Sequence, residues 1–458
     1  MLIKNGLLVF EDGTKNADIR IDGERIVEIE SNLSARDSEE IIEAKDKIVI
    51  PGGVDVHTHM DLDLGAFKAS DDFYTGTVAA AFGGTTSIVD HMAFGPPGCS
   101  ISHQVEVYHG LAGGKAVIDY CYHGVMDHVD DDIITELETL LDMGIPSHKF
   151  YLTYGGMLKD AEVLRLMERA AELGVILCVH AENDGSIAYF RDKFINDGKV
   201  TPIYHARSRP PESEAEAVDR VLWLARMAGD APLYIVHLSS ALGLESVRNA
   251  RRRGQKNIFV ETCPQYLFLD ESKYLDEDGL KYVMSPPLRT KENSEALWDG
   301  ISCGDIDTIG TDHCPFFYGK EKQYGKNDFT KTPNGVPGVE LRVPLMFSEA
   351  LNGRLSLEKF VTLCCAEPSR LFGMYPRKGV LAVGSDADIV IIDPTLNRKI
   401  THGDLHENTD YTPYEGLHVK GYPKMTISRG EVIVRDGEFL GQKGRGKFLK
   451  CGLPLLRR

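Results

Sequence analysis

The apolar residues of the chain follow a repeating pattern between residues 54 and 313. Short apolar runs typical of buried strands alternate with segments in which apolar residues recur every three or four positions, as in amphipathic helices. Eight such runs predict an α/β fold, a (β/α)8 TIM barrel. The competing open doubly wound sheet is disfavoured, because no glycine-rich nucleotide loop accompanies the strands. The runs occupy residues 54–59, 85–91, 115–124, 147–154, 174–182, 232–239, 258–264 and 307–313.

Both ends of the chain are rich in short strands instead. Residues 1–49 contain alternating runs with Asp22-Gly23 as a hairpin turn, and similar runs return after Gly379. This arrangement predicts one small β-sandwich domain assembled from both termini. The tail mixes glycine, basic and apolar residues, so it is either a frayed end or an arm that contacts a neighbouring subunit. The predicted boundaries are 1–50 and 374–440 for the β-sandwich domain, 51–373 for the barrel and 441–458 for the tail.

The composition narrows the classes of partner. The formal net charge of −18 and the pI near 5.3 argue against nucleic acid, which requires a basic face, and against anionic membranes. The nine cysteines include no CxxC spacing, which fits a reducing compartment. No stretch approaches the roughly 18 apolar residues of a membrane span, and the N-terminus does not resemble a signal peptide. We therefore expect a soluble cytoplasmic protein.

The first barrel run ends with two histidines one residue apart, His57 and His59, in the sequence DVHTH. Alone, this pair is weak evidence for a metal site, and a half-buried strand with satisfied polar residues explains it more simply. Other ionisable residues change the picture, because they lie near the C-terminal ends of four further strands, where barrel enzymes carry out their chemistry. These residues are Lys149, His180, His237 and Asp312.

This set of side chains predicts two divalent metal ions. Imidazole and carboxylate ligands suit zinc, manganese or related ions. Two cations would repel an ammonium group, so Lys149 must be neutral or chemically altered, and reaction with CO2 would make it an anionic carbamate able to bridge both metals. A water between metals roughly 3.5–4 Å apart would be deprotonated near neutral pH.

The stretches that carry these residues also resemble a known family. The sequences DVHTHMD, SHKFYLTY, CVHAEND, IVHLSSA and GTDHCPF are similar to those of the hydantoinases and dihydropyrimidinases, which are cyclic amidohydrolases of the amidohydrolase superfamily. The resemblance spans nearly the whole chain. The stretches FGPPGCSISHQVEVY, VETCPQYL and KTPNGVPGVE look particularly like those of bacterial D-phenylhydantoinases.

The resemblance implies a role for each residue. His57, His59 and Asp312 would hold one metal, His180 and His237 would hold the second, and carbamylated Lys149 (N6-carboxylysine) would bridge them. Asp312 would also act as the general base. The family's substrate contacts fall on three further residues, with a tyrosine hydroxyl facing the oxyanion and backbone groups holding the ring amide: Tyr154, Ser285 and Asn334. Without the resemblance, the last two read as ordinary turn residues.

The residues around these motifs bear on the substrate. Dihydroorotases carry a carboxylate-binding arginine where this chain has Asp61, whose charge would repel such a ligand. Loop residues after the first and fourth strands predict an apolar pocket for a ring substituent, although some of them could simply pack the loops: Leu62, Leu64, Phe67, Tyr151 and Leu158.

We therefore expect hydrolysis of 5-substituted, aromatic D-hydantoins to N-carbamoyl-D-amino acids by a homotetramer. The D-stereoselectivity and the tetramer are implied by the resemblance alone. The alternatives are a dihydropyrimidinase acting on dihydrouracil or dihydrothymine, and an allantoinase. A non-catalytic assembly protein of the same fold is disfavoured, because every ligand position is occupied. His91, His123 and His313 also lie near strand ends, where they either support the ligands or pack the core.

Overall fold

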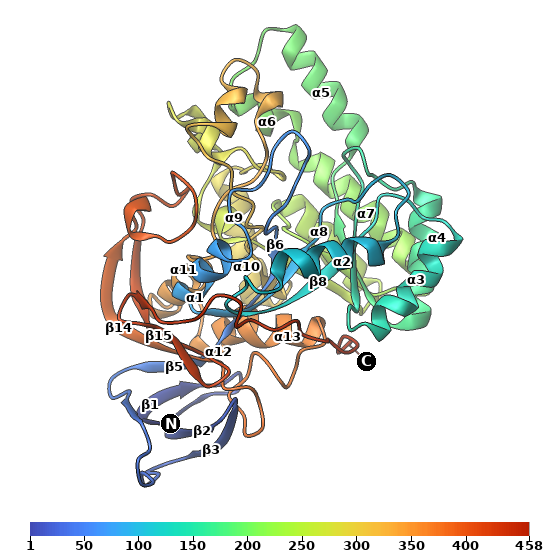
Figure 1. Ribbon diagram of the computed structural model, residues 1–458. Helices are drawn as coiled ribbons and strands as arrows, with labels where there is room; N and C mark the ends of the chain where they lie inside the picture. Colours follow the sequence, from blue (N-terminus) through green and yellow to red (C-terminus); the bar gives the residue numbers. More distant parts are fainter. Residues whose placement is uncertain (458) are drawn as a thin grey trace.

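The computed structural model describes residues 1–457, and its largest element is a parallel eight-stranded sheet in which the strands follow one another in chain order (Figure 1). This order, with helices between strands, confirms the predicted barrel. The strands are β6 (Gly53–Thr58), β7 (Thr85–His91), β8 (Asp119–Val125), β9 (Ser147–Tyr151), β10 (Ile176–His180), β11 (Leu233–Ile235), β12 (Ile258–Thr262) and β13 (Thr308–Ile309).

The first and last strands meet through a few backbone contacts. Thr58 and His313 form an isolated parallel bridge. Backbone N–H groups of Asp312 and His59 donate to the carbonyls of His57 and His313, each over 2.9 Å. The barrel therefore closes at the residues that include three of the predicted metal ligands.

Two barrel strands are shorter than predicted. The runs 232–239 and 307–313 form strands of only three and two residues, β11 and β13. Beyond each strand the backbone adopts positive φ, 40° at His237 and 54° at Asp312, which takes it out of the extended region. Apolar composition indicated where these segments are buried, but not where their backbone turns.

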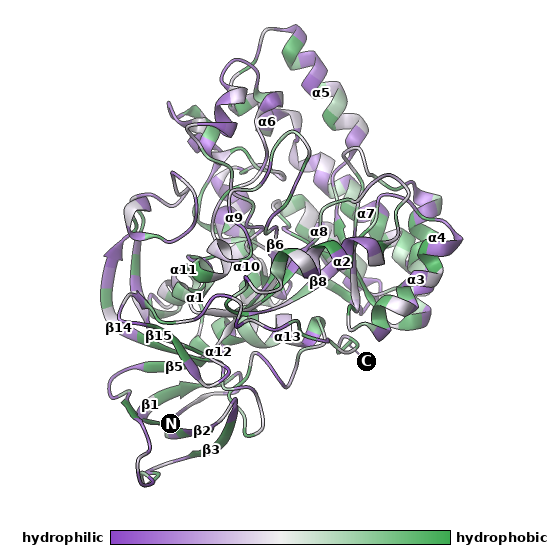
Figure 2. Cartoon of the chain, viewed as in Figure 1, coloured by the Kyte–Doolittle hydropathy of each residue, from purple (hydrophilic) through white to green (hydrophobic). Residues whose placement is uncertain are grey.

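The helices surround the barrel with one apolar face inward. In α3, for example, Ile133, Leu137 and Leu140 are buried, and both polar and apolar residues are visible on α3 and α4 (Figure 2). The long helices are α1 (Thr75–Phe82), α2 (Ile101–Ala112), α3 (Asp131–Asp142), α4 (Asp160–Leu173), α5 (Asp184–Asn196), α7 (Pro211–Met227), α8 (Ala241–Arg252), α10 (Lys291–Cys303) and α11 (Arg342–Leu351). Shorter ones are α6 (Ile203–Ser208), α9 (Pro264–Phe268), α12 (Leu357–Val361) and α13 (Glu367–Leu371).

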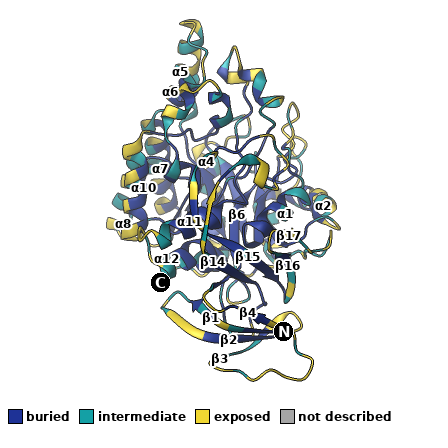
Figure 3. Ribbon diagram, turned by 90° about the vertical axis from the view of Figure 1, so that its left-hand side faces the viewer, coloured by how far each residue is buried: buried dark blue, intermediate teal, exposed yellow. Residues whose placement is uncertain are grey.

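Burial is uneven around the barrel. The central strands are buried, whereas α5 projects from the molecule and buries only Ile187 (Figure 3).

Within residues 1–457, no helix combines the length and the apolar character needed to cross a membrane.

The two ends of the chain form one nine-stranded mixed sheet, which confirms a β domain built from both termini. Its faces differ, because Ile389 and Ile391 pack into a small core of their own while Val390 and Ile392 join the barrel core. The strands are β1 (Leu2–Val9), β2 (Thr14–Asp22), β3 (Arg25–Glu30), β4 (Ile41–Glu43), β5 (Ile48–Pro51), β14 (Ile389–Lys399), β15 (His418–Ser428), β16 (Glu431–Arg435) and β17 (Glu438–Phe439).

The tail lies along its own barrel. The backbone N–H of Leu449 donates to the carbonyl of Tyr120 over 2.7 Å, and that of Cys451 donates to the carbonyl of Gly144 over 3.0 Å. The tail is therefore anchored to β8 and to the loop after α3. Its contact with a neighbouring subunit, like the domain boundaries, stays a prediction.

A buried ion cluster joins the barrel to the β domain. The Lys378 ammonium lies 2.6 Å from Asp119 at the start of β8, and 3.0 and 2.7 Å from Asp386 and Asp388 beside β14. All four side chains are almost completely buried. The cluster lies at the N-terminal ends of the barrel strands, opposite the predicted site.

Replacing Lys378 by methionine removes the cation that the three carboxylates share; Arg429 still pairs with Asp119 and Arg377 with Asp386, while Asp388 loses its ion-pair partner. We expect the substitution to destabilise the fold by about 3–5 kcal/mol, since removing one partner of a buried ion pair leaves uncompensated charge. Thermal unfolding followed by circular dichroism measures this loss. A midpoint equal to that of the wild type would show that the cluster does not hold the two parts together.

Candidate metal and substrate site

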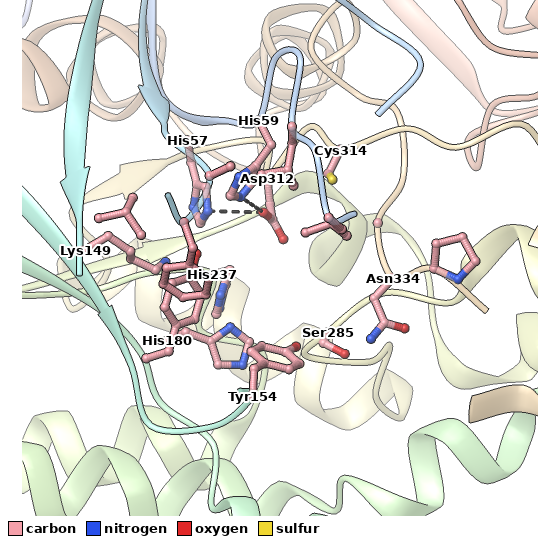
Figure 4. A pocket seen from close by; sticks show the side chains of 18 of the residues that line it. His57, His59, Lys149, Tyr154, His180, His237, Ser285, Asp312, Cys314 and Asn334 are labelled. Carbon is pink, nitrogen blue, oxygen red and sulfur yellow. Dashed lines mark ion pairs between the residues drawn. The ribbon is translucent and has the colours of Figure 1, made fainter. Parts of the chain in front are cut away.

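A cavity of about 360 Å³ opens at the C-terminal ends of the barrel strands (Figure 4). Its wall contains all the residues predicted to bind metal or the reacting ring, although they are spread over most of the chain. Those residues are His57, His59, Lys149, Tyr154, His180, His237, Ser285, Asp312 and Asn334. The sequence prediction of a single site is therefore consistent with the geometry.

The Asp312 carboxylate lies between the two histidines of β6. Its Oδ1 is 3.1 Å from Nε2 of His57 and 3.1 Å from Nε2 of His59 (Figure 4). Burial opposes the negative charge of Asp312, yet the neighbouring His57 and His59 hold its pKa well below the usual range. The carboxylate is therefore charged, and its Oδ2 makes no hydrogen bond within residues 1–457.

Several buried nitrogen atoms in this cluster have no hydrogen-bond partner. Nε2 of His57 lies near Asp312 without hydrogen-bond geometry, and Nδ1 of His237 has no partner. Ligand atoms of His57, His237 and Asp312 all lie within 4.8 Å of one another. Unpaired buried polar atoms are costly, and convergent imidazole and carboxylate atoms are suitable ligands for a divalent metal. These residues fit a metal ion.

The remaining predicted ligands lie beside this group. The rings of His180 and His237 are 4.5 Å apart, centroid to centroid. The Lys149 side chain is buried beside them; its Nζ lies 5.3 Å from the centre of the Tyr151 ring and makes no hydrogen bond or ion pair within residues 1–457. Burial lowers the pKa of Lys149 to about 8. A buried amine without a partner is consistent with a group that is modified in the working protein.

Two buried glutamates, which the sequence analysis did not select, orient the histidines. Glu261 in β12 accepts hydrogen bonds from Nδ1 of His57 over 2.6 Å and from the backbone N–H of His237 over 2.9 Å. Glu182 accepts from Nε2 of His180 over 2.8 Å and from Arg209 over 2.6 Å. Such partners fix the ring orientation of a ligand. The sequence does contain one indication of Glu261, because a charged glutamate within the apolar run IFVETCP needs a buried partner.

The backbone is strained at three of the site residues. The backbone φ values are 40° at His237, 54° at Asp312 and 71° at Tyr154. Residues other than glycine rarely adopt positive φ. At His237 and Asp312 the chain leaves a strand and brings the side chain over the barrel mouth. Strain of this kind clusters at functional sites, where surrounding structure maintains it.

The three predicted substrate contacts lie on one side of the cavity (Figure 4). The Tyr154 ring is 5.1 Å from the His180 ring, and burial raises the pKa of Tyr154 to about 12, so its hydroxyl remains a donor. The backbone N–H and carbonyl groups of Ser285 and Asn334 make no hydrogen bond within residues 1–457. They are therefore free to receive a ligand.

The predicted substituent pocket is only partly assembled. Leu62, Leu64 and Tyr151 line the cavity. Phe67 and Leu158 do not, because Phe67 packs against Phe316 and Tyr324 while Leu158 lies buried below the loop with its N–H bonded to the Tyr151 carbonyl. The structure adds apolar wall residues that the sequence analysis did not select, since they lie at the ends of other strands: Met92, Ala93, Phe94 and Val125.

Asp61 does not face the cavity, contrary to the interpretation of its charge. Its carboxylate accepts from the backbone N–H of Phe73 over 3.2 Å and pairs with Lys68 over 3.0 Å and Lys115 over 3.7 Å. A carboxylate paired in this way does not repel a ligand in the cavity. The lack of an arginine at position 61 still disfavours a dihydroorotase.

The other strand-end histidines are outside the cavity wall. His91 packs between the rings of His57 and His123, at centroid distances of 4.3 and 4.1 Å. His123 contacts the carbonyl of Val56, and His313 contacts Asp71. They therefore support the strands that carry the site and do not replace any predicted ligand.

Comparison with known proteins agrees with this geometry. Residues 48–433 match the amidohydrolase family, and the chain therefore belongs to that family. It is 51% identical to a D-phenylhydantoinase of Escherichia coli O1:K1, with 98% of each sequence covered. Members of the family are typically metal-dependent.

Two solved structures are similar over essentially the whole chain. A dihydropyrimidinase from Brevibacillus agri NCHU1002 superposes with a TM-score of 0.97 and 43% identity, covering 100% of this chain and 99% of that one. A D-hydantoinase from a Bacillus sp. AR9 superposes with a TM-score of 0.96 and 44% identity, covering 99% of both. The similarity therefore includes the barrel and the β domain together.

Replacing Glu261 by glutamine tests its role in orienting His57. A neutral amide accepts a weaker hydrogen bond from the imidazole, so we expect metal affinity to fall roughly 10–100-fold. Titration of the metal-free protein against a competing chelator measures this change. Glu340 is a matched control, because it is buried and bonds to His406 outside the cavity. Equal metal affinities in the Glu261→Gln variant and the wild type would contradict the role.

Proposed function

We propose that this protein hydrolyses the ring amide of 5-substituted hydantoins and releases N-carbamoyl amino acids, with D-hydantoins carrying an aromatic substituent as preferred substrates. The observation that carries the proposal is the convergence, in one cavity, of six candidate metal ligands and three free contacts for a ring amide. The relatives named D-phenylhydantoinase and D-hydantoinase support it.

The metal-binding residues would divide into two groups. We propose that His57, His59 and Asp312 hold one divalent ion, and that His180 and His237 hold another. Lys149 as its carbamate would join the groups, which accounts for a buried amine without a partner. Zinc suits these ligands, as does manganese. When bound, the ions supply Lewis-acid polarisation and an acidified water at neutral pH.

Asp312 would move the proton. Its Oδ1 lies 3.1 Å from Nε2 of both His57 and His59, while its Oδ2 makes no hydrogen bond within residues 1–457. The Oδ2 atom would accept a proton from the attacking water as the new C–O bond forms at the ring carbonyl. The same atom would then return the proton to the ring nitrogen as the C–N bond breaks, which leaves an N-carbamoyl group and a carboxylic acid; the acid then loses the second water proton to solvent at neutral pH.

The ring would be oriented by the free groups on the other side of the cavity. The Asn334 N–H can donate to a carbonyl oxygen of the ring, and the Ser285 carbonyl can accept from the neighbouring ring N–H. Together they can bind one planar amide edge. The Tyr154 hydroxyl can donate to the oxygen that becomes negative in the transition state. These contacts would favour cyclic amides and imides over open-chain ones.

The ring substituent would occupy the apolar end of the cavity. Leu62, Leu64, Phe94 and Tyr151 supply this wall, and the Phe94 and Tyr151 rings meet edge to face at 5.4 Å. Dihydrouracil has no substituent to fill this space, which favours hydantoins over the alternative of a dihydropyrimidinase. That alternative is kept because one similar structure is a dihydropyrimidinase. Nothing in the wall specifically favours allantoin.

The assembly and location of the protein follow from resemblance and composition. We propose a homotetramer, by analogy with the family, in the cytoplasm, in keeping with cysteines that are all unpaired within residues 1–457. A non-catalytic role is disfavoured by the complete set of ligands.

A substrate panel tests the proposed function. Phenylhydantoin, hydantoin, dihydrouracil and allantoin are incubated with metal-loaded protein, and ring opening is followed by loss of ring absorbance and by chiral chromatography of the product. We expect the highest kcat/KM for D-phenylhydantoin. A preference for dihydrouracil would support the dihydropyrimidinase alternative, and no turnover of any ring would refute the function.

Replacing Asp312 by asparagine removes the proton acceptor and one charged metal ligand. We expect kcat to fall by at least about 10²–10⁴-fold, since this range is typical for loss of general-base catalysis. The thermal midpoint reports whether the fold is kept, and metal analysis separates lost metal from lost proton transfer. A fully metallated variant with near-normal turnover would show that another group is the base.

A further inference from the structure

A completely buried lysine lies behind the substrate side of the cavity. Lys322 belongs to a 3-10 turn (Glu321–Gly325), and its ammonium donates to the carbonyls of Val283 over 2.7 Å, Pro333 over 3.0 Å and Gly335 over 2.6 Å. No carboxylate pairs with it within residues 1–457. Its three hydrogen-bond donors thus all serve backbone oxygens of two loops.

These oxygens flank the proposed ring contacts. Val283 is two residues before Ser285, while Pro333 and Gly335 are the immediate neighbours of Asn334. The loops are also joined directly, because the Gly335 N–H donates to the Val283 carbonyl over 3.1 Å. The His205 ring donates to the carbonyl of Met284 over 2.8 Å. The groups beside Ser285 and Asn334 are therefore tied down, and those of Ser285 and Asn334 are left free.

The second loop is seated against the residues that follow Asp312. The N–H of Cys314 donates to the Val336 carbonyl over 3.0 Å. A Cβ atom at Gly335, where φ is 140°, would lie 2.3 Å from the Cys314 carbonyl oxygen. The loop that carries Asn334 is thus in close contact with the segment that carries Asp312, which holds one side of the loop in place.

We propose that Lys322 is a positioning residue, which fixes the spacing of the free backbone groups of Ser285 and Asn334 so that together they receive one edge of the ring. This inference rests on the proposed function. Lys322 does not itself line the cavity; it acts through the two loops that it joins, of which Pro333 and Gly335 form part of the cavity wall.

The choice of lysine fits this role. An ammonium has three donors in a tetrahedral arrangement, which matches three converging carbonyls, whereas the planar guanidinium of arginine is larger and donates in one plane. An apolar side chain would fill the space but leave carbonyls unpaired. Burial lowers the pKa of Lys322 to about 7, with no carboxylate to offset it. Only the ammonium form has a donor for each of the three carbonyls, so these contacts favour the charged form against the effect of burial.

Replacing Lys322 by methionine leaves an unbranched apolar side chain that is one atom shorter, and it removes all three donors. The bond from the Gly335 N–H to the Val283 carbonyl would still join the two loops, but without the ammonium they could shift relative to each other, while the metal ligands remain in place. We expect KM for the ring substrate to rise about 10-fold or more, with kcat reduced at most about threefold, because the Ser285 and Asn334 groups would bind the ring edge about equally in the ground state and in the transition state. Metal content should equal that of the wild type.

Hydrogen–deuterium exchange gives a readout that needs no substrate. In Lys322→Met, peptides covering residues 280–290 and 330–337 should exchange at least about 10-fold faster, and peptides of the barrel strands should not. Lys378→Met is the matched control, since it also removes a buried ammonium but lies at the opposite end of the barrel. That variant should lose stability without a change in KM or in the exchange of these two segments.

The results separate the two proposals. A wild-type protein inert to every ring amide would refute the proposed function, while exchange would still report on the loops. An active wild type, with Lys322→Met unchanged in KM or changed no more than Lys378→Met, would refute the role of Lys322 alone. If Lys322→Met does not fold, Lys322→Gln, which retains an amide donor on a shorter side chain, carries the same comparison at lower temperature.

Discussion

The site depends on how the barrel closes between its last and first strands. β13 is only two residues long, so closure relies on hydrogen bonds just beyond it, where the Asp312 N–H meets the His57 carbonyl and the His59 N–H meets the His313 carbonyl. These contacts place the carboxylate of Asp312 between two imidazoles. The same backbone bonds that complete the barrel thus assemble the first half of the metal site.

The remaining features follow from gathering ionisable groups where water is excluded. Burial opposes the charge of each group, so each needs a partner. Glu261 and Glu182 serve two of the histidines, and the carboxylate of Glu261 helps to raise the pKa of His57 to about 9 against the effect of burial. The nitrogens that still lack partners point to ions that would complete the arrangement. Bound metal ions would therefore give these unpaired nitrogens the partners that burial requires.

The sequence predicted those parts of the structure that depend on local periodicity. Apolar runs located the strands, and a polar residue at a strand end, such as His180, was correctly placed at the cavity. Glu261 was missed because one acidic residue within an apolar run gives no sign of its partner, His57, which is distant in sequence. Phe67 and Leu158 were misplaced because apolar composition does not tell a cavity wall from loop packing.

Residues that act through the backbone of other segments were beyond such predictions. Lys322 lies in a polar stretch and resembles an exposed lysine, yet it is completely buried by loops from two other parts of the chain. Asp61 shows the converse, since its neighbours in sequence are predicted ligands while its carboxylate turns away to two lysines. In both cases long-range packing, which no local pattern encodes, decides where the charge lies.

A crystal structure of the metal-loaded protein, with anomalous diffraction recorded at the metal edge, tests the central claim most directly. Our account predicts two metal peaks about 3.5–4 Å apart. One peak should contact His57, His59 and Asp312, the other should contact His180 and His237, and a carbamate on Lys149 should lie between them. Unmodified Lys149 with no metal at these residues, in crystals of a protein that opens hydantoin rings, would contradict the account.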